Sequence, residues 1–287
     1  ASFCGVFGLK PSNGRVPRAR GLGRPDPNQF SQSGPMANDV RDAALLLQAI
    51  SGPHPADPQQ LLRSRPPDFT AGISENLKGL RVGFSSDMGY GAVDPQVLDQ
   101  VVSGLSTFEK LGANVEESEI ILGIDLADSF WKIFGANAYV QYGHLLAENA
   151  CLLTGGVQEV LSRGREITGH EYATALHTVA ELRMKIDALF ERFDIFVTPT
   201  TSVTAFEPGQ RPSEVAGMMV DSAYGIFPFT YIFNMTGHPA ASVPCGFVDG
   251  LPVGMQIVGR FGDERMVLRA SAAFEEARSW RNVRPSL

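Results

Sequence analysis

The stretch ASFCGVFGLKPSNGRV, from Ala1 to Val16, carries the most information about the fold of this chain. Its glycines between Gly5 and Gly8, like those between Gly21 and Gly23, could be read as a phosphate-binding loop. Neither set has the Lys-Ser/Thr of a P-loop or the full dinucleotide spacing, so tight turns are the better interpretation. Cys4 has no His or Lys neighbour in the sequence that would activate its thiol, and we expect it to be a small buried residue.

Composition describes an ordinary globular chain of 287 residues, 44% hydrophobic and 19% charged, with a formal net charge of -7. This length can bury one large core or two modest ones. The acidic balance and the lack of a Lys/Arg run argue against a nucleic-acid partner. No apolar run reaches the roughly 18 residues of a membrane span, and the first residues show no basic flank leading into an apolar signal core. We therefore expect no membrane association and a cytoplasmic location.

The three cysteines, Cys4, Cys151 and Cys245, are widely spaced and odd in number. This pattern favours reduced thiols over a disulfide framework, and no metal-ligand spacing is present. His170 and His177 would lie about 10 Å apart along a helix axis, which is too far for one metal ion. We expect neither a metal nor a cofactor.

Strand-like and helix-like segments alternate along the chain, which is typical of a sheet covered by helices. A Pro-rich connection is expected at about 53–67. The predicted helices cover 39–51, 95 to about 112, 169 to about 192 and about 263–280; the predicted strands cover 79–84, 194–198, 240–244 and 253–258, the last two around a turn at Asp249 and Gly250.

Helix ends and breaks can be assigned from single residues. Asn38 can cap the first helix, and Asp94 with Pro95 supplies N-cap and N1 of the second. Thr168 to Glu171 spells a capping box for the third. Between 124 and 150 the composition is helical, but Gly135 and Gly143 each cost about 1 kcal/mol against Ala, so a break is expected there.

Ala1 to Val16 resembles the segment that follows the nucleophile in amidase signature enzymes. In that family a Gly/Ser-rich loop ends in Ser, a hydrophobic residue, Arg, any residue, Pro and a small residue, and Ala1 matches the last of these. The resemblance implies that the attacking serine lies shortly before Ala1, with its cis-serine and lysine partners further upstream. We therefore assign no catalytic residue within this chain.

Three further blocks resemble the same family in the same order. Ser31 to Gly52 contains its Ser-x-x-Gly-Pro segment and the following helix, and Asp194 to Thr201 its strand ending in Thr-Pro-Thr. Asn234 to Arg260 contains Asn-x-x-Gly-x-Pro, Pro-Cys-Gly and Gly-Leu-Pro-x-Gly-x-Gln. The resemblance reaches both ends of the chain and is weakest between Pro53 and about Phe193.

The resemblance implies the amidase signature fold, an α/β architecture. Its sheet is mixed, mainly parallel and twisted, with helices on both faces. Residues 1–287 would form the distal part of one domain that is incomplete at its N-terminal side. The implied activity is hydrolysis of a carboxylic amide to acid plus ammonia or amine by a Ser, cis-Ser, Lys triad. We expect a small-molecule amide substrate, leave a homodimer open, and expect the chain to be inactive alone.

No lysine in the sequence replaces the missing base convincingly. Ser129 and Lys132 form the Ser-x-x-Lys of serine beta-lactamases, but the accompanying Lys-Thr-Gly is absent. We interpret this spacing as coincidence and Lys132 as the solvated edge of a helix. His238 is interpreted as structural. Asn234 lies in a glycosylation-type triplet, but a hydrogen bond to backbone near the active site is the better interpretation.

Substrate preference is expected in the segment YGIFPFTYIF, from Tyr224 to Phe233, together with Asn234. The resemblance implies that this segment lines the acyl pocket, so Tyr224, Phe227, Phe229 and Asn234 are the predicted substrate-binding residues. In the A subunits of tRNA-dependent glutamine amidotransferases, an acid that binds the substrate amino group aligns with Phe227. A phenylalanine cannot bind an ammonium in this way, which favours an apolar or aromatic acyl group. The alternatives are a truncated, non-catalytic binding protein and the A subunit of such an amidotransferase.

Overall fold

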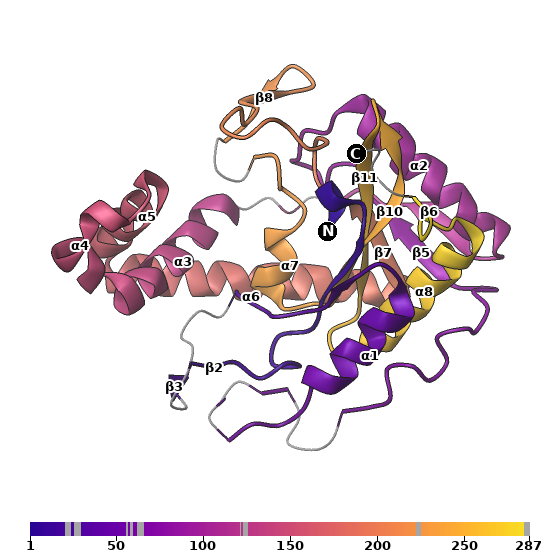
Figure 1. Ribbon diagram of the computed structural model, residues 1–287, viewed down its shortest axis with the longest axis horizontal. Helices are drawn as coiled ribbons and strands as arrows, with labels where there is room; N and C mark the ends of the chain where they lie inside the picture. The colour runs from indigo at the N-terminus through magenta and orange to yellow at the C-terminus, as the bar shows by residue number, and fades with distance from the viewer. Residues whose placement is uncertain are drawn as a thin grey trace.

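A computed structural model describes residues 1–20, 24–25, 30–55, 57, 60–61, 66–120, 122, 126–221 and 225–283. Its main sheet has seven strands in the order β4-β1-β10-β11-β7-β5-β6 (Figure 1). Their bounds are β1 Phe7–Lys10, β4 Met36–Ala37, β5 Arg81–Phe84, β6 Asn114–Glu117, β7 Ile195–Pro199, β10 Ala240–Val248 and β11 Leu251–Gly259. Two small ribbons pair β2 (Ala19–Arg20) with β3 (Arg24–Pro25) and β8 (Glu214–Val215) with β9 (Met218–Met219). Part of the predicted Pro-rich connection, at 56, 58–59 and 62–65, lies outside the described residues.

The sheet is mixed, as expected, but the expectation of a mainly parallel sheet is wrong for the described residues. Only β7–β5 and β5–β6 pair in parallel there. The pairs β4–β1, β1–β10, β10–β11 and β11–β7 are antiparallel. A parallel pair needs a long crossover, whereas β10 and β11 are joined by a two-residue turn that can connect only antiparallel neighbours.

The β10–β11 hairpin confirms the predicted turn. Asp249 and Gly250 both adopt positive φ, at 49° and 78°. This backbone twist matches that of the flanking strands, as in the turns that two-residue hairpins prefer. The register pairs Ser242 with Gln256 and shifts between Pro244 and Gly246. Both strands are longer than predicted, since β10 covers Ala240–Val248 instead of 240–244 and β11 covers Leu251–Gly259 instead of 253–258.

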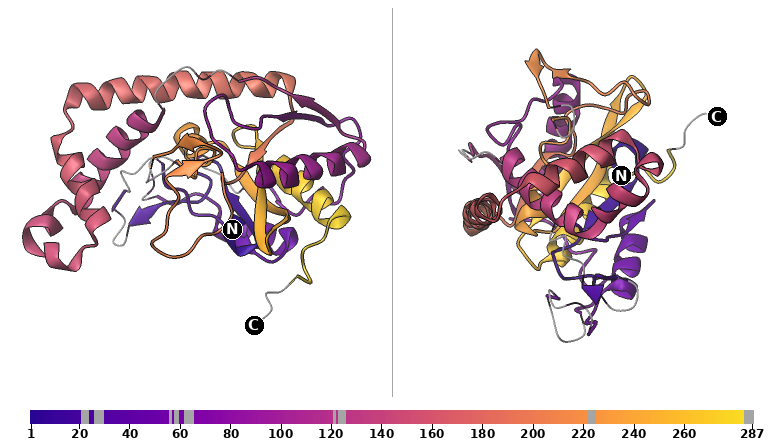
Figure 2. Two further views of the ribbon diagram at one scale, coloured as in Figure 1. Left: turned by 90° about the horizontal axis from the view of Figure 1, so that it is seen from above. Right: turned by 90° about the vertical axis from the view of Figure 1, so that its left-hand side faces the viewer.

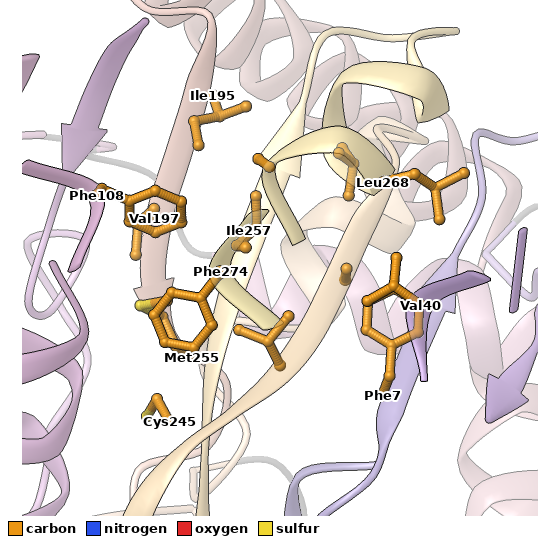
Figure 3. Packing of buried hydrophobic residues seen from close by; sticks show 14 of the residues in the cluster. Phe7, Val40, Phe108, Ile195, Val197, Cys245, Met255, Ile257, Leu268 and Phe274 are labelled. Atoms are coloured by element: carbon orange, nitrogen blue, oxygen red, sulfur yellow. The ribbon is translucent and has the colours of Figure 1, made fainter. Parts of the chain in front are cut away.

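One face of the sheet is covered by α1 (Val40–Ile50), α2 (Pro95–Lys110) and α8 (Glu264–Ala277). Figure 3 shows Ile195 and Val197 of β7 packed in the core on this face. Phe196, which lies between them, packs on the other face. Because side chains alternate along a strand, the short apolar run of β7 serves both cores.

The opposite face is covered by α6 (Gly169–Arg192) and the short α7 (Tyr231–Thr236), and α3 (Leu126–Tyr142) packs against these two helices. Figure 2 shows α6 running across the molecule as its longest helix. Helices therefore cover both faces, which confirms that part of the predicted architecture. None of the helices in the described segments is long and apolar enough to cross a bilayer.

The helix caps follow the sequence with one correction. Asp39, not Asn38, caps α1, and its carboxylate accepts a hydrogen bond from the Asp42 amide. The error arose because the helix begins one residue later than predicted, so Asp39 occupies the cap position. Asp94 caps α2, and the Thr168–Glu171 capping box opens α6, both as expected.

The helices α3, α4 (His144–Glu148) and α5 (Gly155–Glu166) form an arm that projects from the sheet (Figure 1). Gly143 separates α3 from α4, which confirms the predicted break there. Gly135 does not break α3. A Cβ on Gly164 would lie 2.0 Å from the Gly135 carbonyl oxygen, so the two glycines let α3 and α5 touch backbone to backbone.

Candidate active site

Three polar side chains and one glycine form a row across the sheet, on the face covered by α7, and we call it the polar row. The strand register places Gly8, Ser242, Gln256 and Thr198 side by side on β1, β10, β11 and β7. The Gln256 amide donates to Thr198 Oγ1 at 2.9 Å and to the Phe229 carbonyl at 3.0 Å. These buried polar groups are therefore satisfied within the protein and hold fixed positions.

Hydroxyl groups extend this row toward the end of β7. Thr200 Oγ1 lies 2.9 Å from Ser242 Oγ, and Ser2 Oγ lies 3.5 Å from Thr201 Oγ1. Gly254 lies between the two pairs. A Cβ there would lie 2.5 Å from Ser2 Oγ and 2.6 Å from Ser242 Oγ, so only glycine leaves room for both hydroxyls.

The first residues of the chain lie directly on this row. A Cβ on Gly8 would lie 2.6 Å from the Ala1 Cβ, so β1 needs glycine where Ala1 crosses it. The Ala1 carbonyl accepts hydrogen bonds from the Cys4 and Val6 amides. The short helix Ser2–Cys4 ends at Gly5, whose φ is 61°. A tight turn at Gly5, within the first predicted site, holds the beginning of the chain over the sheet, while Gly8 lies in β1. The second predicted site, Gly21 to Gly23, lies outside the described residues.

A cavity of about 290 Å³ opens beside Ala1 above the polar row. Amide, hydroxyl and apolar groups line it, together with one lysine. The lining residues are Ala1, Gly8, Leu9, Lys10, Gln32, Gly34, Pro35, Met36, Thr200, Thr230, Asn234, Ala240, Ala241, Ser242 and Gln256. The cavity thus combines neutral hydrogen-bonding groups with an apolar wall, as small-molecule sites do.

Lys10 lies at the end of β1, two residues from Gly8 and therefore on the same face of the sheet. Its ammonium donates to the Pro11 carbonyl at 3.0 Å. Burial lowers the pKa of Lys10 to about 7, although the Glu264 carboxylate opposes this shift.

Glu264 fixes the turn that follows Lys10. The completely buried carboxylate accepts hydrogen bonds from the Ser12 amide at 2.8 Å and from Arg15 Nε at 2.9 Å. Arg15 Nη2 also lies 2.7 Å from Glu264 Oε2. Burial alone would raise the pKa of Glu264, but Arg15 and Ser12 outweigh burial and lower it. The carboxylate is therefore ionised and already paired.

His238 has the structural role that the sequence suggested. Its ring is completely buried, with Nδ1 2.9 Å from Thr236 Oγ1 and Nε2 2.9 Å from Asp187 Oδ1. It also stacks on Phe190. Burial lowers the pKa of His238 to about 4, so the ring is neutral near pH 7.

The four predicted substrate-binding residues occupy different surroundings. Asn234 lines the cavity and donates to the Phe30 carbonyl at 2.6 Å, which confirms a hydrogen bond to backbone. Phe227 lies 5.9 Å from Phe3, centroid to centroid. Phe229 is completely buried in the core beneath α7. Tyr224 lies outside the described residues.

Other positions singled out in the sequence lie away from this cavity. Lys132 Nζ lies 2.6 Å from Asp128 Oδ2 on the same helix, while Ser129 is buried. Cys4 is exposed, so the expectation of a buried residue is wrong. Cys4 is exposed because it lies at the end of the short helix Ser2–Cys4, which precedes β1, and not in a strand of the sheet. Cys245 is buried, and burial raises its pKa to about 12.

Sequence reasoning missed the polar row itself. Its members come from strands far apart in the chain, so no local motif contains them. The available signal was a polar residue inside each otherwise apolar strand, namely Thr198, Ser242 and Gln256. Their alignment depends on strand register, which the sequence did not provide.

Comparison with known proteins agrees with this architecture. The amidase family model matches residues 1–268. An acylamidase from Rhodococcus erythropolis is 32% identical over 293 residues, covering 100% of this chain and 60% of that protein. The A subunit of a glutamyl-tRNA(Gln) amidotransferase from Geobacillus stearothermophilus is 32% identical over 311 residues, covering 100% of this chain and 62% of that protein.

Solved structures show the same similarity. A bacterial aryl acylamidase of the amidase signature family superposes with a TM-score of 0.88 at 27% identity, covering 100% of this chain and 62% of that one. A 6-aminohexanoate cyclic dimer hydrolase in complex with substrate gives 0.84 at 28% identity, covering 99% and 63%. The chain spans about 60% of the length of these curated relatives. Family match and fold together show that the chain belongs to the amidase signature family.

Proposed function

We propose that this chain forms the distal part of an amide hydrolase that converts a carboxylic amide to an acid plus ammonia or an amine. In this proposal the attacking serine, its cis-serine partner and the lysine base belong to a segment that precedes Ala1 in a longer protein. The observation that supports it is the position of Ala1, which lines the cavity and crosses the polar row at Gly8.

Chain geometry supports the position of that serine. An extended chain advances at most about 3.3–3.6 Å per residue, so a serine a few residues before Ala1 stays close to the cavity. The described residues would then hold the amide. Thr200 and Ser242 offer hydroxyls on the cavity floor. The carboxamides of Asn234 and Gln256 are bonded to backbone carbonyls, so they fix the wall of the site.

We further propose that the acyl group is apolar or aromatic. Phe227 belongs to an aromatic group with Phe3 and Phe206, in which the centroids of Phe227 and Phe206 lie 5.9 Å and 5.8 Å from that of Phe3. Phe3 is two residues from Ala1, so this group lies near the beginning of the chain. The Arg211 guanidinium lies over the Phe227 ring, 6.0 Å from its centroid.

The A subunit of a tRNA-dependent amidotransferase is the alternative that the relatives favour, since several of them carry that name. Such a protein would act with partner proteins on charged tRNA. The aromatic side chain at position 227 counts against it, because it offers no carboxylate for the amino group of an amino-acid substrate. A non-catalytic binding protein, a cytoplasmic location and a homodimer remain predictions.

The test measures hydrolysis of a panel of small aryl and alkyl amides by the 287-residue chain and by the same chain preceded by its upstream coding sequence. A serine-reactive phosphonate with peptide mapping locates the nucleophile. We expect turnover and label only in the longer protein, on a serine before Ala1. Turnover by the 287-residue chain, with label on one of its own serines, would contradict the proposal.

A further inference from the structure

We propose that Lys10 makes the cavity a carboxylate-binding site, so that the preferred amides carry a free carboxylate besides the bond to be cleaved. The substrate class rests on the proposed amide hydrolysis. The binding of a carboxylate does not depend on that function and can be measured without turnover.

The side chains that line the cavity give it a positive charge. Among the described residues that line it, Lys10 is the only ionisable side chain, and neither Asp nor Glu contributes. The remaining polar lining consists of amides and hydroxyls. A cavity lined by the Lys10 ammonium and by no acidic side chain attracts an anion, and its partly apolar wall strengthens that attraction by excluding water.

Glu264, the acid near Lys10, is already paired with other groups. Glu264 accepts hydrogen bonds from both Ser12 and Arg15, so Lys10 is not its principal partner. In the described part of the chain, the Lys10 ammonium donates one hydrogen bond, to Pro11. An ammonium has three N–H donors. Two therefore remain available for a ligand.

A hydroxyl group in the same cavity can donate a second hydrogen bond to the bound carboxylate. Thr200 and Ser242 line the same cavity, and either hydroxyl of this pair could be the donor. A carboxylate has two oxygens and accepts from charged and neutral donors at once. An ammonium and a hydroxyl in one cavity supply a charged and a neutral donor, which match a carboxylate better than a neutral amide or ester.

Ionisation of Lys10 makes this binding depend on pH. The charged or titratable groups near it are the Ala1 amino group, which lines the same cavity, Glu264, which is ionised and paired with Arg15, and His238, which is neutral. Because burial lowers the pKa of Lys10 to about 7, carboxylate binding should weaken as the pH rises through about 7. By linkage, a bound carboxylate should raise the pKa of Lys10.

Isothermal titration of the 287-residue chain with benzoate and with benzamide tests the proposal. The two probes have nearly the same shape and differ in charge. We expect benzoate to bind about tenfold more tightly than benzamide at about pH 6, and to lose about tenfold by pH 8.5, when Lys10 is largely neutral. Equal binding of the two probes at the lower pH would overturn the proposal.

Variants locate the effect at Lys10. Lys10→Met should abolish the preference for benzoate, and Lys10→Arg should keep it. Lys78→Met removes an exposed lysine outside the cavity and should bind both probes as the unmodified chain does. A Lys10→Met variant that retains the preference for benzoate would contradict the assignment.

A second measurement needs no variant. Carbon-13 NMR of the lysine ε-methylene groups follows titration of Lys10, and benzoate should shift that titration to higher pH while benzamide should not. An unchanged titration at saturating benzoate would overturn the proposal. Benzoate binding through Lys10 without amide turnover in the longer protein would refute the proposed function alone.

Discussion

Replacing Arg15 by methionine tests the buried ion pair beneath the candidate site. Arg15 and Glu264 are almost completely excluded from solvent, with side-chain exposures of 4% and 0%. Arg15→Met keeps much of the side-chain volume but removes the guanidinium. Glu264 would then retain one hydrogen bond, from the Ser12 amide. The perturbation therefore leaves a buried carboxylate without its countercharge.

The expected loss of stability is large. Removing one partner of a buried ion pair costs about 3–5 kcal/mol, because the remaining charge is neither solvated nor paired. Unfolding of a chain this long carries an entropy of about 0.6 kcal/mol/K at about 2.1 cal/mol/K per residue, so about 4 kcal/mol corresponds to a fall in Tm of about 7 °C. The matched control Arg163→Met breaks an exposed pair with Glu159, with side-chain exposures of 72% and 60%, and should change Tm little.

Differential scanning calorimetry of both variants and of Arg15→Met/Glu264→Met measures these effects. The double variant removes the stranded charge and should recover much of the lost stability. In the unmodified chain the pKa of Glu264 is lowered, so this stabilisation is present above the ordinary value of 4.5 and is lost as the pH falls below it. An Arg15→Met variant as stable as the Arg163→Met control would refute the reasoning.

Three further outcomes are expected. Thr168→Ala should destabilise the chain by about 1 kcal/mol in urea unfolding, because it removes the capping box of α6, and no change would count against that cap. Gly164→Ala should cost about 1–3 kcal/mol and speed amide exchange in α5, since its Cβ would meet the Gly135 carbonyl, whereas Gly156→Ala faces open space and should stabilise slightly. Because burial lowers the pKa of His238 from 6.5 to about 4, the unfolded chain takes up the proton first and stability should fall as the pH drops through that window. Urea unfolding of His238→Gln at a series of pH values should show a smaller loss of stability between pH 6.5 and 4 than the unmodified chain shows. An equal loss in both proteins would refute the lowered pKa of His238.

Features predicted correctly from the sequence depend on neighbouring residues. The capping box at Thr168, the N-cap at Asp94 and the turn at Asp249 and Gly250 are each contained within a few positions. Local backbone chemistry decides such features, whatever the rest of the chain does. The Asn38 cap failed by one residue because Asn and Asp cap equally well and the pattern does not choose between neighbours.

Features that the sequence did not predict depend on register and on distant contacts. The antiparallel direction of β1 against β10 and of β11 against β7 follows from which strands become neighbours, which a single sequence does not state. The burial of Phe229 and the exposure of Cys4 likewise follow from tertiary packing. Lys10 became a candidate only when β1 placed it beside the cavity.

The position of β1 also has a consequence for the order of folding during synthesis. Gly8 pairs with Ser242 of β10, a strand that is translated long after β1. Until then, among the described strands, β1 has only the two-residue β4 as a partner, and its edge toward β10 is unpaired. An unpaired strand edge invites pairing with other chains, and distant contacts slow folding. Folding of the cavity therefore waits for the C-terminal hairpin, and nascent chains stalled before β10 should bind chaperones that completed chains release.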